Sequence, residues 1–202
     1  DKMIELVEDR LDIDTYLELR QSVQFRELTR DQAKKGLSNS LYTLVAFKDG
    51  KNEEARIQMS VAALEAGIAF NNASVTIIHG MSRPIGALFH VAHGLSNAML
   101  MKECLGFALE GAYDRFADLG RAIGVADAID EDKAAAQKFL SAIEGIVKEL
   151  ETPTLAEFGI DKDEFFKVID KMAYDAMDSG SPQNTMREVS EEQVKQIYRN
   201  LW

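Results

Sequence analysis

The chain has 202 residues, 46% of them apolar, and its 34 acidic and 23 basic residues give a net charge of −11. This length and apolar content are enough for the core of one domain. The acidic surplus opposes binding to nucleic acid and to anionic membrane surfaces. The only cysteine, Cys104, excludes an intrachain disulfide and is expected to be a buried apolar residue. The sequence shows no signal peptide and no apolar run of about 18 residues, so we expect a cytoplasmic location and no membrane contact.

Apolar residues recur three and four positions apart along almost the whole chain, which predicts an all-α fold, a multi-helix bundle. Asn52 before two glutamates, and Ser190 with Gln193, are typical of helix N-termini. Short stretches rich in turn-forming residues separate the helices, at 48–52, 151–154 and 178–184. The expected helices cover residues 12–28, 31–47, 52–72, 74–88, 95–120, 130–150, 161–177 and 190–201.

The expected helix at 52–72 carries a regular apolar pattern. Its larger apolar residues lie three or four positions apart: Ile57, Val61, Leu64 and Ile68. With the small residues between them they predict a wide buried stripe, and therefore a helix of the core.

All three histidines of the chain lie within residues 77–94, IIHGMSRPIGALFHVAHG: His79, His90 and His93. His79 and His93 are too far apart for adjacent turns of one helix, but Gly94 and the residues before it allow one helix to end and another to begin between them. Two helices can then direct two imidazoles at one point, and imidazole is a favoured ligand of divalent zinc and iron. On spacing alone, histidines hydrogen-bonded between helices remain the alternative.

Other residues of the same segment predict close packing. Gly80 and Gly86 lack side chains where another part of the backbone or a ligand can approach. Pro84 predicts either a kink or a position in the first turn of a helix.

Residues 67–101 resemble the signature region of the iron-containing (group III) alcohol dehydrogenases. The shared features are a His-Gly pair at 79–80, Ile-Gly-Ala at 85–87, and a second His-Gly at 93–94 followed by Asn-Ala. Weaker likeness continues to the C-terminus, so the resemblance covers roughly residues 29–202. That family joins an N-terminal α/β domain, which binds NAD(P), to a helical C-terminal domain of the dehydroquinate synthase-like type, which carries the metal. The resemblance implies the second domain only.

The resemblance also implies metal ligands. In the family an aspartate, a histidine four residues later, and two further histidines hold the ion, and the last two fall on His79 and His93. Counting back by the family's usual separation reaches Asp12 and Tyr16, so the first histidine ligand is missing from this chain. Asp12 is therefore a weak candidate ligand, with an ordinary surface carboxylate as the alternative. The ion would be iron or zinc.

Two more residues are candidates for a catalytic role. Arg83 stands where many family members have a histidine near the nicotinamide, and Ala92 replaces the proline before the last ligand. A guanidinium cannot shuttle a proton near neutral pH, but it can bind phosphate or carboxylate on a cofactor or substrate. A surface salt bridge is the alternative for Arg83. His90 falls beside the ligands but not on a ligand position, so it would line the pocket or lie at the surface.

We therefore expect a divergent helical segment at residues 1–28 and a helical metal-binding domain at 29–202. The sequence has no glycine-rich dinucleotide loop, so NAD or NADP would bind to a nucleotide-binding domain absent from this chain. The expected partners are a small alcohol or aldehyde, that missing domain and, in a homodimer, a second copy of the chain.

Three functions stay open on the sequence. The first is the metal-binding domain of an NAD(P)-dependent alcohol or polyol dehydrogenase, incomplete and inactive alone. The second is a non-catalytic interaction or assembly module whose metal site has decayed, which the missing ligands favour. The third is a hydrolase with a histidine-bound metal, disfavoured because no carboxylate lies in a ligand-spaced motif with the histidine pair.

Overall fold

The computed structural model describes residues 34–38 and 40–202. The described residues contain helices and no strand, which confirms the all-α prediction. The expected helix at 12–28, with Asp12 and Tyr16, lies outside the described residues.

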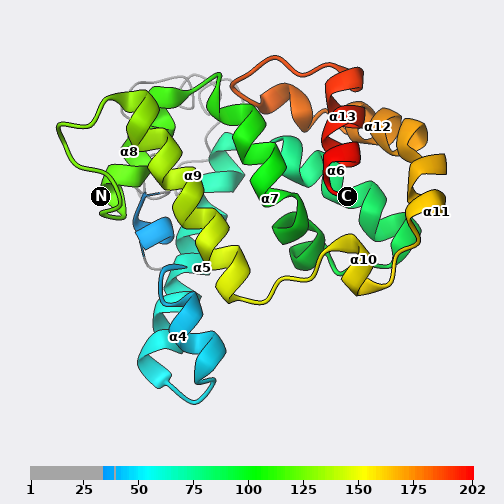
Figure 1. Cartoon of the computed structure of the whole chain (residues 1–202). Helices are drawn as coiled ribbons and strands as arrows, with labels where there is room; N and C mark the ends of the chain where they lie inside the picture. The colour runs from blue at the N-terminus through cyan, green and yellow to red at the C-terminus, as the bar shows by residue number, and fades with distance from the viewer. Residues whose placement is uncertain (1–33, 39) are drawn as a thin grey trace, which may run out of the picture.

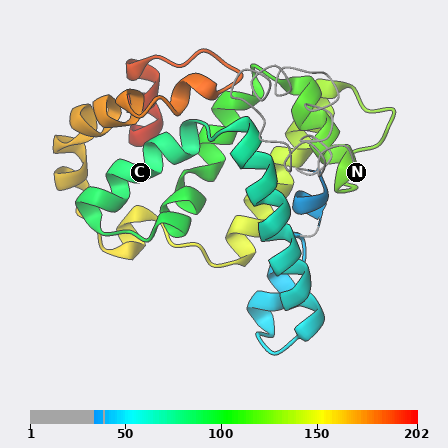
Figure 2. The same ribbon diagram turned by 180° about the vertical axis from the view of Figure 1, so that it is seen from behind.

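The helices form a bundle from which α4 and α5 project together as an arm, visible from both sides in Figures 1 and 2. The elements, with their bounds, are α4 Thr43–Lys48, α5 Glu53–Ala73, α6 Ile77–Phe89, α7 His93–Leu109, α8 Tyr113–Ala122, α9 Asp132–Glu149, α10 Leu155–Phe158, α11 Lys162–Lys167, α12 Ile169–Asp178, η1 Pro182–Asn184 and α13 Glu191–Asn200. The predicted helix starts at Asn52 and Ser190 are confirmed, because both side chains accept hydrogen bonds from the first turn and Gln193 completes a capping box with Ser190.

The core lies where α6, α7, α12 and α13 meet. Tyr198 of α13 is fully buried there and its hydroxyl donates a 2.7 Å hydrogen bond to the Met81 carbonyl of α6. Cys104 of α7 is fully buried as expected, with its sulfur 3.7 Å from that of Met81, and burial raises the pKa of the Cys104 thiol far above its usual range. Met81 of α6 thus contacts both α7 and α13.

Three of the predicted helices are wrong in extent. The expected helix at 95–120 ends at Leu109 and a new helix begins at Tyr113. Gly111 lies in the break and packs against Arg187, since a Cβ at Gly111 would lie only 2.7 Å from the Arg187 Cβ. The expected helix at 161–177 is divided at Val168 into α11 and α12.

The described part of the expected helix at 31–47 is divided as well. Residues 34–38 are helical and a turn at 41–42 precedes α4. Ser38 donates to the Lys34 carbonyl at 3.0 Å, and Ser40 donates to the Leu37 carbonyl at 2.6 Å. Serine hydroxyls that bond to nearby carbonyls compete with regular helix, which accounts for the interruption.

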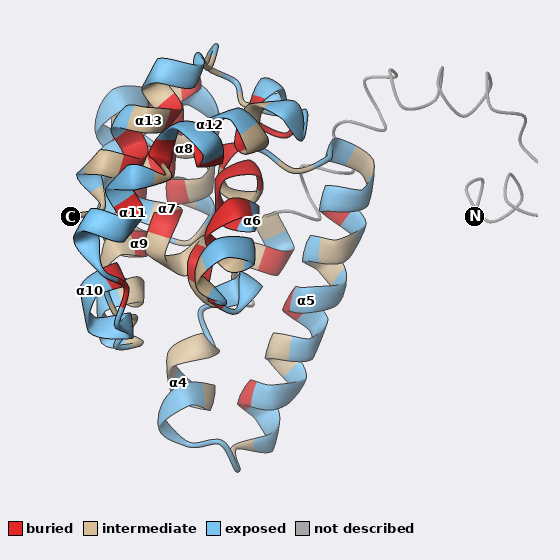
Figure 3. Ribbon diagram, turned by 90° about the vertical axis from the view of Figure 1, so that its right-hand side faces the viewer, coloured by how far each residue is buried: buried red, intermediate tan, exposed pale blue. Residues whose placement is uncertain are grey.

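The prediction that the large apolar residues of α5 form a buried stripe is wrong (Figure 3). The four residues expected in the core are all exposed, with Leu64 exposing 65% of its surface and Ile57 56%. The buried residues are instead three alanines seven positions apart, Ala55, Ala62 and Ala69. Alanine allows close approach by α4 and the segment before it, so the helix packs on its small residues and presents its large apolar residues outward.

No single helix among the described residues is long and apolar enough to cross a membrane. Only α5 and α6 taken together pass by length and composition, and they are bent by 105°.

The tightest contact of α6 gives a test of this packing. A Cβ on Gly80 would lie 2.8 Å from the Pro182 Cδ and 2.9 Å from its Cγ. Because the proline ring is rigid and buried, we expect Gly80→Ala to lower the free energy of unfolding by about 1 to 3 kcal/mol. Gly145→Ala is the matched control, since Gly145 lies inside α9 with nothing near its missing Cβ; it should raise stability by up to about 1 kcal/mol. Chemical denaturation followed by circular dichroism measures both, and equal effects would contradict the packing.

Candidate functional site

The candidate site is built by a reversal of the chain after α6. His90 ends α6 in the left-handed conformation, with φ 56° and ψ 27°, which histidine adopts more readily than most residues. Val91, next along the chain, is buried, and its carbonyl would lie 3.2 Å from a Cβ on Gly86. The glycine therefore lets the chain return along α6, as its sequence position predicted. This return places His93, the first residue of α7, beside the beginning of α6.

His79 of α6 and His93 of α7 face each other across this junction. Their ring centroids lie 5.3 Å apart and the rings are tilted by 55°. A nitrogen ligand lies about 2.0 to 2.1 Å from zinc, so the centres of two imidazoles sharing one tetrahedral ion are about 5 Å apart. The spacing of the two rings matches that of a shared ion. The prediction that two helices bring these imidazoles together is confirmed; that they bind a metal remains a prediction.

Hydrogen bonds orient the His93 ring from both sides. The Ser82 hydroxyl lies 3.2 Å from the His79 carbonyl, to which it donates, and 3.4 Å from His93 Nδ1. Because that hydroxyl has one proton, it accepts from a protonated Nδ1, which leaves Nε2 of His93 unprotonated. The amide nitrogen of Asn97 lies 3.3 Å from Nε2 and can donate to it. In this arrangement the Nε2 lone pair of His93 accepts from the Asn97 amide, so an ion bound at Nε2 would have to displace that hydrogen bond.

The site carries positive charge. Arg83 lies one turn after His79 on α6, is exposed, and donates to the Ser181 hydroxyl at 3.4 Å. Within the described part of the chain no carboxylate pairs with Arg83, so the alternative of a surface salt bridge finds no partner there. Burial, the neighbouring His93 and then Arg83 all lower the pKa of His79. None of these causes is an acidic group.

Two imidazoles are only half of a metal site. Among the described residues no group of three histidine, cysteine, aspartate or glutamate side chains could hold an ion. Asp12, the remaining candidate ligand, lies outside those residues. The described residues therefore offer a divalent ion two ligands and no third.

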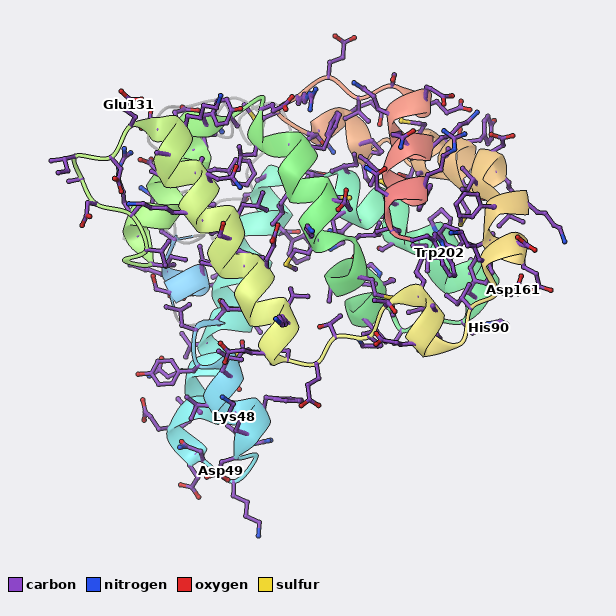
Figure 4. The ribbon with its side chains drawn as sticks, in the orientation of Figure 1. Lys48, Asp49, His90, Glu131, Asp161 and Trp202 are labelled. Carbon is purple, nitrogen blue, oxygen red and sulfur yellow. The ribbon has the colours of Figure 1, made fainter. Side chains whose placement is uncertain are left out.

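His90 does not join the pair. It is exposed at the far end of α6, eleven positions from His79 and so roughly 16 Å away along the helix axis, at the edge of the bundle (Figure 4). Its visible role is to reverse the chain. The catalytic role suggested for it stays a prediction that this position does not favour.

Comparison with known proteins identifies the family. The model of the Fe-containing alcohol dehydrogenase family, C-terminal part, matches residues 24–202. The chain belongs to this family. It is 30% identical over 161 residues to the choline dehydrogenase of Bacillus subtilis, which covers 80% of this chain and 39% of that protein. It is 29% identical over 152 residues to the NADPH-dependent butanol dehydrogenase of Clostridium saccharobutylicum, covering 75% and 39%.

The fold agrees with solved structures of the same family. A crystal structure of 1,3-propanediol oxidoreductase superimposes with a TM-score of 0.75 at 28% identity, covering 85% of this chain and 44% of that one. The chain thus spans about two fifths of the length of the relatives it matches. Iron-containing alcohol dehydrogenases whose C-terminal part it resembles use NAD(P) and a divalent metal.

Sequence reasoning missed three side chains at the site. Asn97 lies four residues after His93 in α7, so helical spacing alone could have indicated its contact. Ser82 reaches His93 across two helices, and Ser181 reaches Arg83 from a distant turn. No local pattern marks contacts of that kind.

The lowered pKa of His79 gives a test of the charge at this site. Because burial is the largest cause and Arg83 the smallest, we expect Arg83→Gln to raise the pKa of His79 only part of the way to the ordinary value. The unfolded chain takes up the proton more readily, so folding stability should fall as the pH falls through about 6.5. Titration of the histidine ring protons by NMR measures the shift. Arg56→Gln, on the distant arm, is the control, and an unchanged or lower pKa in Arg83→Gln would contradict the proximity.

Proposed function

We propose that the chain is the metal-binding part of an NAD(P)-dependent dehydrogenase that interconverts a small alcohol and its aldehyde or ketone. The observation that carries this proposal is the convergence of His79 and His93, from two helices, at the spacing of two ligands of one ion. A bound iron or zinc ion would act there as a Lewis acid on the substrate oxygen. We further propose that the enzyme acts in the cytoplasm.

In this proposal the residues of the chain orient and bind. His79 and His93 would hold the ion, with Ser82 fixing the His93 ring through Nδ1 and the ion taking the place of the Asn97 amide at Nε2. Arg83 would contact substrate or cofactor, since its charge lacks a carboxylate partner among the described residues. Residues 29–202 would form the metal-binding domain and residues 1–28 a divergent segment. NAD or NADP would bind to a separate nucleotide-binding domain.

The number of ligands sets the expected strength of metal binding. Two neutral imidazoles give a divalent ion neither the usual three or four protein ligands nor a compensating negative charge. The chain alone should therefore hold metal weakly and show no turnover. A nucleotide-binding domain joined to the chain should bind NAD or NADP, which accepts the hydride.

Metal titration and reconstitution test this function. Zn²⁺ should bind the chain weakly in calorimetry, and His79→Ala or His93→Ala should weaken binding further, by roughly 10-fold or more, because one of two ligands is lost. The chain joined to the N-terminal part of the Clostridium butanol dehydrogenase should oxidise at least one member of a panel of neutral alcohols and hydroxy acids with NADP, and both variants should lose this activity. His90→Asn, which keeps a residue tolerant of the left-handed conformation, is the control.

Either of two results would contradict the proposal. One is unchanged Zn²⁺ affinity in both histidine variants, which would remove the pair from the site. The other is tight, stoichiometric metal binding and NAD-linked turnover by these 202 residues alone, which would show that the chain needs no further domain.

The second candidate function, an assembly module, is favoured by the outer face of α5. Ile57 and Leu64 each expose more than half of their surface on this face, and Val61 and Ile68 beside them are also exposed. Apolar residues gathered on one projecting element are typical of association surfaces. In this reading the arm pairs with a second copy of the chain in a homodimer.

Sedimentation velocity tests the assembly function. If the arm forms the dimer, Leu64→Glu should give monomers at concentrations where the unchanged chain is dimeric, because a carboxylate would be buried without a partner. Ile129→Glu is the matched control, since Ile129 is an apolar residue with 94% exposure in a loop of the bundle. A monomeric unchanged chain, or equal behaviour of the two variants, would reject pairing through the arm.

A further inference from the structure

We propose that the site binds an oxyanion through Arg83, and that the substrate is therefore an alcohol or carbonyl compound bearing a carboxylate or phosphate group. This inference rests on the proposed function, whose reaction it leaves unchanged, and it narrows the class of substrate. It follows from the charge of Arg83 beside His79 and from the backbone amides at the start of α7.

The first observation is the sign of the charge. Arg83 is permanently positive, lies on the same face of α6 as His79, and is exposed to an incoming ligand. Its hydrogen bond among the described residues, to the Ser181 hydroxyl at 3.4 Å, is to a neutral group. A guanidinium has five donors, so most of them remain available. In the described part of the chain, nothing acidic neutralises it.

The second observation is that α7 begins at the same place. Ala92, its N-cap residue, has no side chain that could accept a hydrogen bond from the first turn. The exposed residues His93 and Gly94 follow directly. The amide groups at the start of this 17-residue helix, and its dipole, add to the positive potential that Arg83 provides.

These features select against a cationic substrate. The choline of the Bacillus relative's name carries a quaternary ammonium, which a guanidinium beside the site would repel. Neutral alcohols such as butanol would leave the Arg83 charge without a partner. A carboxylate or phosphate can instead accept two parallel hydrogen bonds from the guanidinium, which fixes its orientation as well as its position.

Anion binding to the metal-free chain tests this inference. Glycolate and inorganic phosphate are titrated at about pH 8, above the ordinary histidine pKa of about 6.5, and the ring protons of His79 and His93 are followed by NMR. We expect saturable shifts in both rings. Arg83→Gln should weaken binding by about 10-fold or more, as expected for lost charge-assisted hydrogen bonds. Arg83→Lys should retain part of the affinity, and Arg56→Gln all of it.

The choice of anion distinguishes the sources of the oxyanion. Tighter binding of glycolate supports a hydroxy acid as substrate, and tighter binding of phosphate supports a phosphorylated alcohol. If NADPH displaces phosphate and NADH does not, the site holds the 2′-phosphate of the cofactor, and the substrate assignment is overturned. Equal effects of chloride and of both oxyanions, or unchanged affinity in Arg83→Gln, would overturn the site itself.

The anion titration distinguishes failure of this inference from failure of the proposed function. Because the titration contains neither metal nor a nucleotide-binding domain, loss of the dehydrogenase function leaves anion binding measurable. Conversely, a chain that fails to bind oxyanions but loses Zn²⁺ affinity on changing His79 would keep the proposed function and lose only the substrate class.

Discussion

The whole arrangement depends on how closely other parts of the chain approach α6. Gly80 lets Pro182 of η1 pack so closely that a Cβ on the glycine would lie 2.8 Å from the proline ring. Gly86 allows the chain after α6 to pass close by at Val91. Between them, Met81 is fully buried against Cys104 and accepts the hydrogen bond of Tyr198. A larger residue at Gly80 would force Pro182 outward, and one at Gly86 would press on Val91, two residues before His93. The site is therefore a consequence of core packing on both sides of one helix.

Much of this could be predicted from the sequence, because the signals are local. Helix type followed from spacing, the start of α13 from Ser190 and Gln193, and the junction of two helices between His79 and His93 from Gly94. The failures are of another kind. The break before α8 lies at Gly111, a residue type that commonly ends helices, but its contact with Arg187, distant in the sequence, has no local signal.

The wrong prediction for α5, where alanines and not large apolar residues are buried, also reflects contacts that the local sequence does not specify. A helical apolar pattern shows that one face is apolar, but it does not show whether small or large residues form the contact. Here the alanines pack at close range, and the large residues Ile57 and Leu64 face outward in the described structure. Burial of the large residues in place of the alanines would remove more apolar surface from water. An apolar surface that covered this face would therefore stabilise the complex. The arm is therefore suited to association, whichever function the histidine pair serves.

The histidine pair favours a cation as ligand, whereas Arg83 favours an anion. Neutral imidazoles can accept a cation but offer it no charge, and a nearby guanidinium raises the cost of placing a divalent ion there. An anion between the ion and Arg83 would interact favourably with both. Metal and anion should then bind more tightly together than separately, since each removes the repulsion that the other meets. In a relative with histidine in place of Arg83 that coupling would be weaker, because a neutral ring neither repels the ion nor attracts the anion. If the two histidines hold an ion, Arg83 in place of histidine therefore favours an anion as the ligand that accompanies it.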